Sequence, residues 1–541
     1  MTSGYADVPR PVNEPVHAYA PGTAERAALA AELAAVAAQT VEAPHVIAGE
    51  PRHGDTTFTV RAPHDHELHL ADVHQATPGL VDDAIGAARA AAPAWARTPF
   101  EERAAIFLRA ADLVAGPWRD RLNAATILGQ SKSWQQAEID AACEAIDFLR
   151  FNVAFARDLL SHQPLNVPGV WNRTDYRPLE GFVLAITPFN FTAIALNLPT
   201  APALMGNTVI WKPSEKQALA AHWTMRILQA AGLPPGVINL VHGDGALVSD
   251  VALRSPDFAG LHFTGSSTVL QGLWRRAAEH LDTYRGFPRI VGESGGKDFV
   301  VAHPSALVDE LVVALGRGAF EYQGQKCSAV SRAYVPRSLW PRVRDGLADL
   351  ARALPVGDVA DPTVFFGAVI DGGAFRKHAD AIAAAVDGGA KLVTGGGSDD
   401  RTGWFVEPTV LEAEDPRSQA MTTELFGPIL TVHVYDDARW PETLELVDGT
   451  SPYALTGAVF AQDRAAVDEA ATVLRQAAGN FYVNDKPTGA IVGQQPFGGA
   501  RRSGTNDKAG SVLNLQRWTS PRVIKETFVP PTDWRYPHLD G

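Results

Sequence analysis

Short apolar runs alternate with longer helix-forming stretches through the middle of the chain. The runs at 181–186, 208–211, 237–241 and 260–263 have the length of buried strands, and residues 217–231 predict a helix between two of them. Alternation of this kind is typical of a parallel sheet with helices on both faces, which binds ligands at the carboxyl ends of its strands. The sequence therefore predicts an α/β fold with a doubly wound sheet.

Ala-rich stretches predict further helices before this sheet. Residues 23–39 form one, with Thr23 as N-cap, and Cys143 lies in another, where a packing role is expected. Residues 1–22 are expected to be an extended arm. The remaining expected elements are helices at 81–96, 101–115 and 135–160 and strands at 58–61 and 68–73.

A second α/β series begins near residue 296. A strand at 299–301 precedes a helix at 304–320 and a strand at 332–335. The tail from 510 carries no Gly-rich motif and is expected to dock on a partner subunit. Further helices are expected at 338–353 and 375–387, and further strands at 391–394, 429–435 and 455–460.

Composition narrows the classes of function. The 541 residues suffice for two or three domains, and 20% charged residues is typical of a globular protein. A net charge of −14 argues against a nucleic-acid-binding face, which would be basic. The two cysteines, Cys143 and Cys327, cannot form a disulfide framework, and no Cys/His cluster has zinc spacing. No metal site is expected.

The N-terminus lacks the apolar run of a signal peptide, and no run of about 18 uncharged apolar residues suggests a membrane span. A reducing compartment suits the cysteine content. We therefore expect a cytoplasmic protein.

Cys327 lies in the loop between the helix expected at 304–320 and the strand expected at 332–335, and it is the first candidate catalytic residue. A thiolate is a strong nucleophile once its pKa is lowered, although a lone cysteine is more often a small buried apolar residue. Glu293, within Gly292-Glu293-Ser294-Gly295-Gly296-Lys297, could be a general base or simply a solvated carboxylate.

Four other stretches follow expected strands or lie in loops. Asn190 could donate to an oxyanion or occupy a turn. Lys212 and Glu215 could hold ribose hydroxyls or form a solvated turn. Ser266 begins an expected helix whose N-terminus could bind a phosphate, and Glu424 lies in the stretch Glu-Leu-Phe-Gly-Pro.

Together, the stretches Pro-Phe-Asn, Lys-Pro-Ser-Glu, Phe-Thr-Gly-Ser, Glu-Ser-Gly-Gly-Lys, Gly-Gln-Lys-Cys and Glu-Leu-Phe-Gly-Pro resemble the aldehyde dehydrogenase superfamily. The resemblance runs from about residue 23 to the C-terminal region. It implies that Cys327 is the nucleophile, that Glu293 is the base that activates water, and that Asn190 and the Cys327 N–H stabilise the oxyanion. It also implies an NAD site, with Glu215 favouring NAD over NADP. The implied NAD-binding residues are Lys212, Glu215, Ser266, Glu424 and Phe426.

Two features resemble the 1-pyrroline-5-carboxylate dehydrogenase branch of that superfamily, which oxidises L-glutamate γ-semialdehyde to L-glutamate at the end of proline breakdown. Leu270 stands where the wider superfamily usually has a glycine, and residues 484–499 resemble the branch's substrate-anchoring loop. The alternatives are an enzyme for another short aldehyde, a CoA-acylating relative, or a non-catalytic member of the fold. The implied substrate-binding residues are Ser328, Gly489, Ala490, Phe191 and Phe497.

The resemblance also implies the domain organisation. Residues 23–165 and 182–293 would form the NAD-binding domain and 294–490 the catalytic domain. A hairpin at 166–181 would join the tail at 510–541 as an oligomerisation element. A homo-oligomer is expected, and a proline dehydrogenase is a candidate partner.

Overall fold

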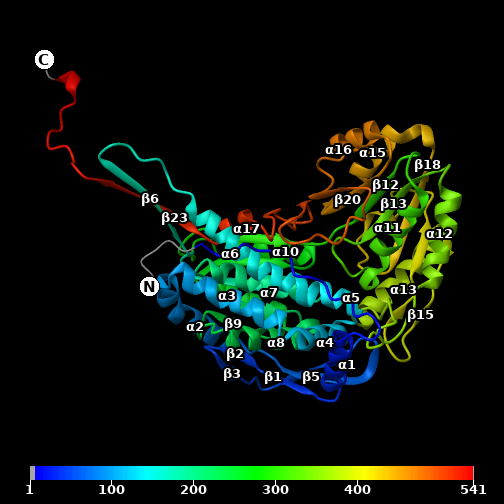
Figure 1. Cartoon of the computed structure of the whole chain (residues 1–541), viewed down its shortest axis with the longest axis horizontal. Coiled ribbons are helices and arrows are strands. Elements are labelled where there is room, and N and C mark those ends of the chain that lie inside the picture. The colour runs from blue at the N-terminus through cyan, green and yellow to red at the C-terminus, as the bar shows by residue number, and fades with distance from the viewer. Residues whose placement is uncertain (1–6, 540–541) are drawn as a thin grey trace.

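The computed structural model describes residues 7–539 and consists of two α/β bodies and a projecting arm (Figure 1). The first body is built on a seven-stranded sheet of order β11-β10-β7-β8-β9-β2-β3, and the second on one of order β14-β17-β18-β13-β12-β20-β21. The fold is thus α/β, as the sequence predicts. No helix among residues 7–539 is long and apolar enough to cross a membrane.

Five parallel strands make up most of the first sheet, and their side chains alternate between two helical layers. Val183 and Ala185 pack with one apolar cluster, whereas Phe182 and Leu184 pack with the other. Burial on both faces explains why these strands are uninterrupted apolar runs. The strands are β7 (Phe182–Thr187), β8 (Thr208–Pro213), β9 (Ile238–Leu240), β10 (Phe258–Thr264) and β11 (Arg289–Glu293), extended by the antiparallel β2 (His45–Ile47) and β3 (Glu50–Arg52).

Two sets of helices cover this sheet. One face packs against α2 (Pro78–Arg97), α9 (Gly245–Arg254) and α10 (Ser267–Glu279). The other packs against α7 (Thr192–Leu204) and α8 (Ala218–Ala230), over which lie α3 (Phe100–Ala115), α4 (Arg119–Gln130) and α6 (Ala145–Ser161). Helix α4 is not among the helices predicted from the sequence, because its buried residues include the polar Asn123, Thr126 and Gln130, which obscure an apolar stripe.

The helical run expected at 135–160 is three pieces: α5 (Trp134–Ala137), the π-helical segment η1 (Glu138–Glu144) and α6. Cys143 lies in η1 and is buried, as expected. The N-terminal helix is α1 (Ala24–Ala37), with Thr23 at the N-cap position as expected, although its hydroxyl donates to the Ala20 carbonyl and makes no capping hydrogen bond. A small sheet of order β1-β5-β4 follows: β1 (Val41–Ala43), β4 (Thr57–Ala62) and β5 (Asp65–His74).

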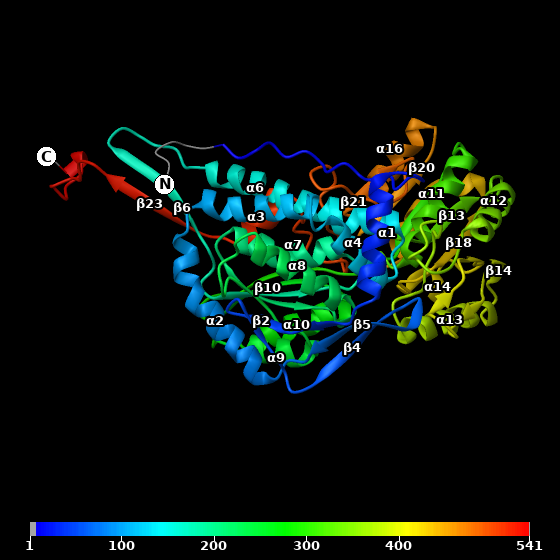
Figure 2. The same cartoon turned by 60° about the horizontal axis from the view of Figure 1, so that its bottom comes forward.

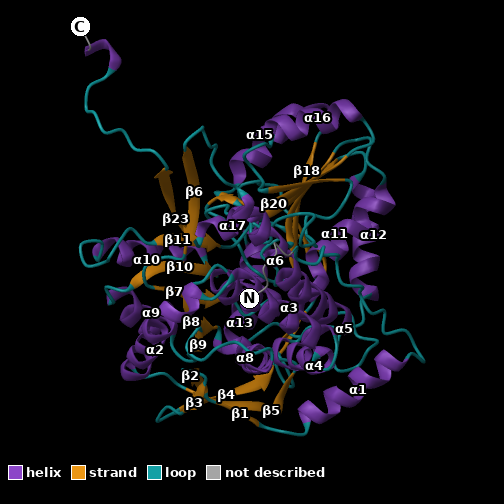
Figure 3. Ribbon diagram, turned by 60° about the vertical axis from the view of Figure 1, so that its left-hand side comes forward, coloured by secondary structure: helices purple, strands orange, loops and turns teal. Residues whose placement is uncertain are grey.

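The second body repeats the two-faced arrangement, with α12 on one side of its strands and α15 and α16 on the other (Figure 3). Its helices are α11 (Val308–Phe320), α12 (Trp340–Ala353), α13 (Gly372–Asp387), α14 (Gln419–Thr422), α15 (Trp440–Thr450) and α16 (Arg464–Val473). Its strands are β12 (Asp298–Ala302), β13 (Val330–Pro336), β14 (Lys391–Thr394), β17 (Thr409–Glu412), β18 (Ile429–Tyr435), β20 (Thr456–Phe460) and β21 (Asn480–Val483). The short pairs β15 (Ser398–Asp399) with β16 (Phe405–Val406) and β19 (Tyr453–Ala454) with β22 (Ala500–Arg501) complete it.

Helix α11 begins at Val308, four residues after the expected start. Local hydrogen bonding before it competes with a helical turn, because the Ser305 N–H donates to His303 Nδ1 at 3.2 Å. The Ser305 hydroxyl also accepts hydrogen bonds from the N–H groups of Gln462 and Asp463, each at 3.0 Å.

The arm consists of two strands from distant parts of the chain (Figures 1 and 2). The segment expected as a hairpin at 166–181 supplies only the single strand β6 (Val170–Arg177). As expected, it joins the C-terminal tail, because β6 pairs antiparallel with β23 (Ser520–Thr527) along its whole length. The short helix α17 (Val512–Arg517) precedes β23, and Trp518 between them is fully buried in the first body. The tail therefore docks on its own chain before it reaches the arm.

Candidate active site

Cys327 follows a loop that is held in an unusual conformation. Tyr322 and Gln323 have φ angles of 51° and 53°, in the left-handed region that non-glycine residues avoid. The side-chain amide of Gln323 donates to the carbonyls of Ser131 and Ala368, each at 2.8 Å, and so holds this conformation. The backbone leading to the thiol is thus fixed by segments distant in sequence.

Asn190 follows β7 and reaches the same loop. It is buried, and its Nδ2 donates to the carbonyl of Gln325, two residues before Cys327, at 3.0 Å. The amide nitrogen carries a second hydrogen, which this bond leaves unused. Asn190 is therefore positioned as a donor near the thiol, as an oxyanion hole requires.

Glu293 ends β11 and is held by the loop at 503–505. The N–H of Ser294 donates to the Ser503 carbonyl at 2.9 Å, and the N–H of Thr505 donates to the Gly292 carbonyl at 2.8 Å. Burial raises the pKa of the Glu293 carboxyl to about 7. A carboxylate with this pKa is suited to accept a proton near neutral pH.

The thiol of Cys327 is not activated by the protein alone. Burial raises its pKa above the ordinary value, and the carboxylates of Glu293, Asp298 and Glu424 add to the effect, against one backbone N–H that lowers it. The effects that raise the pKa outweigh this one N–H, and a further positive group near the sulfur would favour the thiolate.

A cavity of about 350 Å³ brings the nucleophile, the base and the expected substrate residues together. Its size suits a small metabolite. Asn190 is not among its lining residues, but seven sequence-predicted residues are: Cys327, Glu293, Ser328, Phe191, Phe497, Gly489 and Ala490.

The loop around Gly489 is shaped to approach an anion. The hydroxyls of Ser328 and Thr488 lie 2.8 Å apart, and Lys486 Nζ donates to the Thr488 carbonyl at 3.0 Å. Gly489 has φ +97°, and a Cβ there would lie 2.8 Å from Lys486 Nζ. Only glycine suits this position, and with Ala490 it leaves two backbone N–H groups without bulky side chains next to the cavity.

A second group of sequence-predicted residues lies at the carboxyl ends of β8 and β10. Lys212 is in β8 and Glu215 begins the 3-10 turn η2 (Glu215–Gln217). Burial lowers the pKa of Lys212, while Glu215 and Asp244 oppose this. Ser266 is the N-cap of α10, where its hydroxyl accepts a hydrogen bond from the Val269 N–H at 3.2 Å. A dinucleotide is bound at such strand ends and helix N-termini.

Glu424 lies in a cradle that only glycines permit. Its Oε1 accepts a hydrogen bond from the Gly296 N–H at 2.9 Å, and a Cβ on Gly295 would lie 2.0 Å from its Oε2. Phe426 has φ 59° and contacts Phe189 edge to face, with ring centroids 5.8 Å apart. Sequence reasoning had missed Phe189, although it lies within the quoted Pro-Phe-Asn stretch. The arrangement fits a ribose held by the carboxylate beside two aromatic rings.

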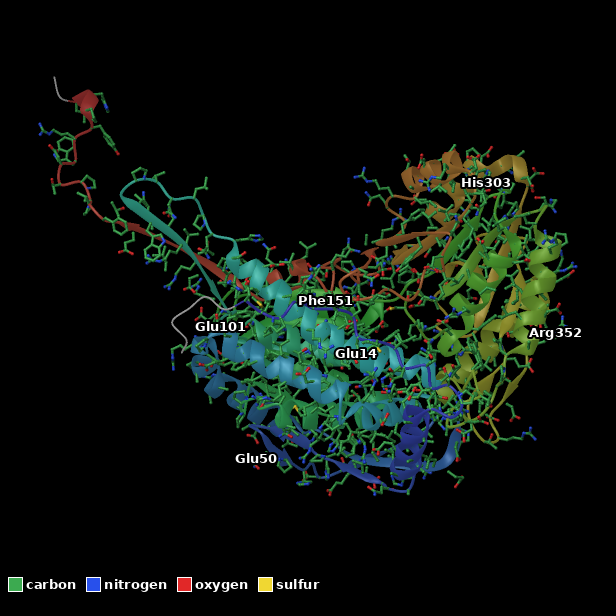
Figure 4. The ribbon with its side chains drawn as sticks, in the orientation of Figure 1. Glu14, Glu50, Glu101, Phe151, His303 and Arg352 are labelled. Carbon is green, nitrogen blue, oxygen red and sulfur yellow. The ribbon has the colours of Figure 1, made fainter. Side chains whose placement is uncertain are left out.

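Residues of the N-terminal arm also line the cavity, which the sequence did not indicate. Asn13 Nδ2 donates to Asp147 at 2.7 Å, and the Glu14 carboxylate accepts from Arg119 and Arg150, each at 2.7 Å. Asn13 and Glu14 are lining residues of the cavity, and Figure 4 labels Glu14 beside the helices of the first body. Nothing in the spacing of a polar, Pro-rich arm reveals such long-range contacts.

A buried ion pair supports Phe191 in the cavity wall. Asp140 accepts from Lys132 Nζ at 2.7 Å and from the N–H groups of Thr192 and Ala193 at 2.9 Å, so that it caps α7. Lys132 Nζ lies 4.1 Å from the centroid of the Phe191 ring. The cation is thus paired on one side and covered by an aromatic face on the other.

The structure gives a reason for the leucine at position 270. Leu270 is buried under β11, and a Cβ at Gly292 would lie 2.6 Å from its methyl groups. The larger side chain is accommodated because Gly292, next to Glu293, has none. Leu270 is therefore part of the packing behind the candidate base.

Comparisons with known proteins agree with this geometry. The model of the aldehyde dehydrogenase family matches residues 50–524. A delta-pyrroline-5-carboxylate dehydrogenase from Mycobacterium tuberculosis, solved with NAD bound, is 58% identical, with a TM-score of 0.97 and 100% of both chains covered. The mitochondrial delta-1-pyrroline-5-carboxylate dehydrogenase of Dictyostelium discoideum is 48% identical over 99% of this chain and 96% of its own. Proline utilization A from Bdellovibrio bacteriovorus is 30% identical, with a TM-score of 0.92, over 96% of this chain but only 54% of that protein.

Proposed function

The chain belongs to the aldehyde dehydrogenase family, and we propose that it oxidises L-glutamate γ-semialdehyde, which forms from 1-pyrroline-5-carboxylate, to L-glutamate with NAD. This is the last step of proline degradation. One observation carries the proposal: a single cavity is lined by Cys327, by Glu293 and by the loop at Gly489, whose backbone N–H groups can bind an anion.

The residues divide the reaction into two steps. Cys327, as thiolate, attacks the aldehyde carbon, and the oxyanion of the thiohemiacetal is stabilised by the Asn190 amide and the Cys327 N–H. Collapse of the oxyanion expels the aldehyde hydrogen as a hydride, which a bound NAD would accept, and leaves a thioester on Cys327. Glu293 then takes a proton from the water that attacks this thioester, and L-glutamate and the free thiol result.

The described residues suit NAD. Lys212, Glu215 and Ser266 would hold the adenosine end and the pyrophosphate, and Glu424 with Phe426 would hold the nicotinamide ribose. When bound, NAD supplies the two-electron acceptor and a positive ring near the thiol. That positive charge is of the sign needed to oppose the three carboxylates that raise the pKa of Cys327.

The substrate's α-carboxylate would bind to the N–H groups of Gly489 and Ala490 and to the Ser328 hydroxyl. Its aliphatic part would lie between Phe191 and Phe497, both of which line the cavity. An anion bound by backbone N–H groups needs no opposite charge.

The test is to measure NADH formation with pyrroline-5-carboxylate, succinate semialdehyde and propanal side by side. We expect pyrroline-5-carboxylate to give the highest kcat/KM by at least about tenfold, the ratio that one good polar contact provides. Equal rates for all three would leave an aldehyde dehydrogenase of another specificity. No turnover of any aldehyde, with NAD still bound, would indicate a non-catalytic member of the fold.

We also propose a homo-oligomer assembled through the arm. Its strands expose Trp171 and Val523, and Phe528 just beyond it is 60% exposed. Large exposed apolar side chains on a projecting element are typical of a subunit interface. Light scattering on the whole chain and on a chain ending at residue 519 tests this. The particle formed by the shortened chain should contain fewer subunits.

The domain boundaries given above are likewise proposed, with the two sheets in their support. A proline dehydrogenase is the proposed source of the substrate, and co-purification of the two activities would test it. A cytoplasmic location stays a prediction, since the name of the Dictyostelium relative places that protein in mitochondria.

A further inference from the structure

Three potential metal ligands meet at the edge of the small N-terminal sheet. Glu42 lies in β1, His74 ends β5, and His53 follows β3. Glu42 Oε1 is 3.1 Å from His74 Nε2 and 3.6 Å from His53 Nε2, and all three ligand atoms lie within 4.8 Å of one another. None of the three lines the active-site cavity. Glu50, at the lower edge of the molecule in Figure 4, marks this region.

The hydrogen bonding of His74 leaves a lone pair facing a carboxylate. Its Nδ1 lies 3.1 Å from the carbonyl oxygen of Gly54, which can only accept, so that Nδ1 carries the hydrogen. In a neutral ring Nε2 is then bare, and it faces Glu42 Oε1 at 3.1 Å. Two lone pairs at this distance need a positive centre between them, either a second proton or a metal ion.

His74 also makes the hydrogen bond that is typical of a metal-ligating histidine. In such sites the ring nitrogen that does not bind metal usually donates to a backbone carbonyl or a carboxylate, which fixes the orientation of the ring. The Gly54 carbonyl has this role for His74. The rings of His53 and His74 lie at 83° to each other, with centroids 4.7 Å apart.

Two of the three distances between ligand atoms are close to those of tetrahedral coordination. Bonds of about 2.0–2.1 Å to imidazole nitrogen and carboxylate oxygen place two tetrahedral ligands roughly 3.3 Å apart. The two distances from Glu42 Oε1, 3.1 and 3.6 Å, lie on either side of this value. An ion of this kind would need only small side-chain movements.

The backbone that carries the ligands is firmly held. The Gln75 N–H donates to the Thr56 carbonyl at 2.9 Å, and a Cβ at Gly54 would lie 2.1 Å from the Gln75 oxygen. Glu42 is fixed by the parallel pairing of β1 with β5, in which it is opposite Asp72. The three ligands are therefore presented on a preformed scaffold.

We propose that Glu42, His53 and His74 bind one divalent transition-metal ion of the zinc type, with water in the remaining position. Imidazole and carboxylate together suit Zn²⁺ better than the hard cations, which prefer oxygen alone. The ion joins β1, β5 and the loop after β3, and so has a structural role. Sequence spacing did not indicate it, because the ligands come from three separate segments.

Zinc titration calorimetry tests this site in a Cys327→Ala background, in which the active-site thiol cannot compete. We expect one Zn²⁺ per chain and at least tenfold weaker binding in Glu42→Gln, His53→Asn and His74→Asn. His69→Asn is the matched control, because His69 forms a similar pair with Asp72 on the same strand, at 3.0 Å, without a third ligand. The control should bind Zn²⁺ like the parent.

Thermal unfolding with and without Zn²⁺ gives a second readout, since an ion that binds only the folded chain raises Tm. The rise should be lost in the three ligand variants and kept in His69→Asn. Equal zinc binding by the parent and the ligand variants, or an equal loss in the control, would overturn the proposal. His53 is exposed, so its variant keeps the test decisive even if His74→Asn does not fold.

Discussion

The acid–base behaviour of Glu293 gives the sharpest prediction. Burial raises the pKa of its carboxyl to about 7, and the active form in thioester hydrolysis is the carboxylate. The hydrolysis rate should therefore rise with pH through this value. For a single group, roughly 9% is ionised at pH 6 and roughly 91% at pH 8, so that a hydrolysis-limited kcat should rise about tenfold. A solvated glutamate, with a pKa of about 4.3, would give a flat profile over this range.

Two charged neighbours of Glu293 allow the direction of the shift in its pKa to be tested. Lys508 lowers the pKa of Glu293 and Asp507 raises it. Lys508→Met should therefore move the inflection to higher pH, and Asp507→Asn should move it to lower pH. Opposite shifts cannot result from general loss of stability, which would lower activity at every pH.

The assay is NADH formation at saturating substrate, with the rapid first turnover recorded separately from the steady state. Glu293→Gln should keep the rapid first turnover and lower the steady-state rate by about 10²–10⁴, the usual contribution of a general base. If the variant retained the wild-type rate and pH profile, or if both neighbour variants shifted the inflection in the same direction, the reasoning would be refuted.

Three further predictions follow from individual contacts. Cys327→Ala should abolish both phases of NADH formation while NAD still binds, as measured by fluorescence quenching; appreciable residual turnover would exclude Cys327 as nucleophile. Ser328→Ala should raise KM for pyrroline-5-carboxylate by about ten- to hundredfold, the worth of one hydrogen bond to a charged group, and leave propanal unaffected; equal losses for both would contradict carboxylate binding. Lys132→Met should lower the free energy of unfolding by about 3–5 kcal/mol, because it leaves the buried Asp140 without its cation; a urea titration that shows less than about 1 kcal/mol would contradict this.

The sequence predicted the centre of each body well, for a physical reason. A parallel strand covered on both faces must be apolar at successive positions, and so β7, β8 and β12 appear directly as apolar runs. Residues at the ends of such strands meet at one edge of the sheet. Glu293 and Asn190 therefore reach the same region although about a hundred residues separate them.

Features that depend on distant contacts could not be predicted in this way. The left-handed backbone at Gln323 exists because Ser131 and Ala368 accept its side-chain hydrogen bonds, and neither partner is near in sequence. The cavity-lining residues Asn13 and Glu14 lie in a polar arm that has no periodicity. In each case tertiary contacts, rather than local propensity, decide the conformation.

The pairing of β6 with β23 has a consequence for how the protein is made. Arg177 and Ser520, which pair in the arm, are 343 residues apart. At about 5–20 residues per second, a ribosome needs roughly 20–70 s to synthesise the chain between them. Until then β6 has no partner strand, and the place of the buried Trp518 in the first body is open to solvent. The first half of the chain therefore keeps an unpaired edge and uncovered apolar surface until residues 518–527 emerge, and during this interval chaperones have access to the nascent protein.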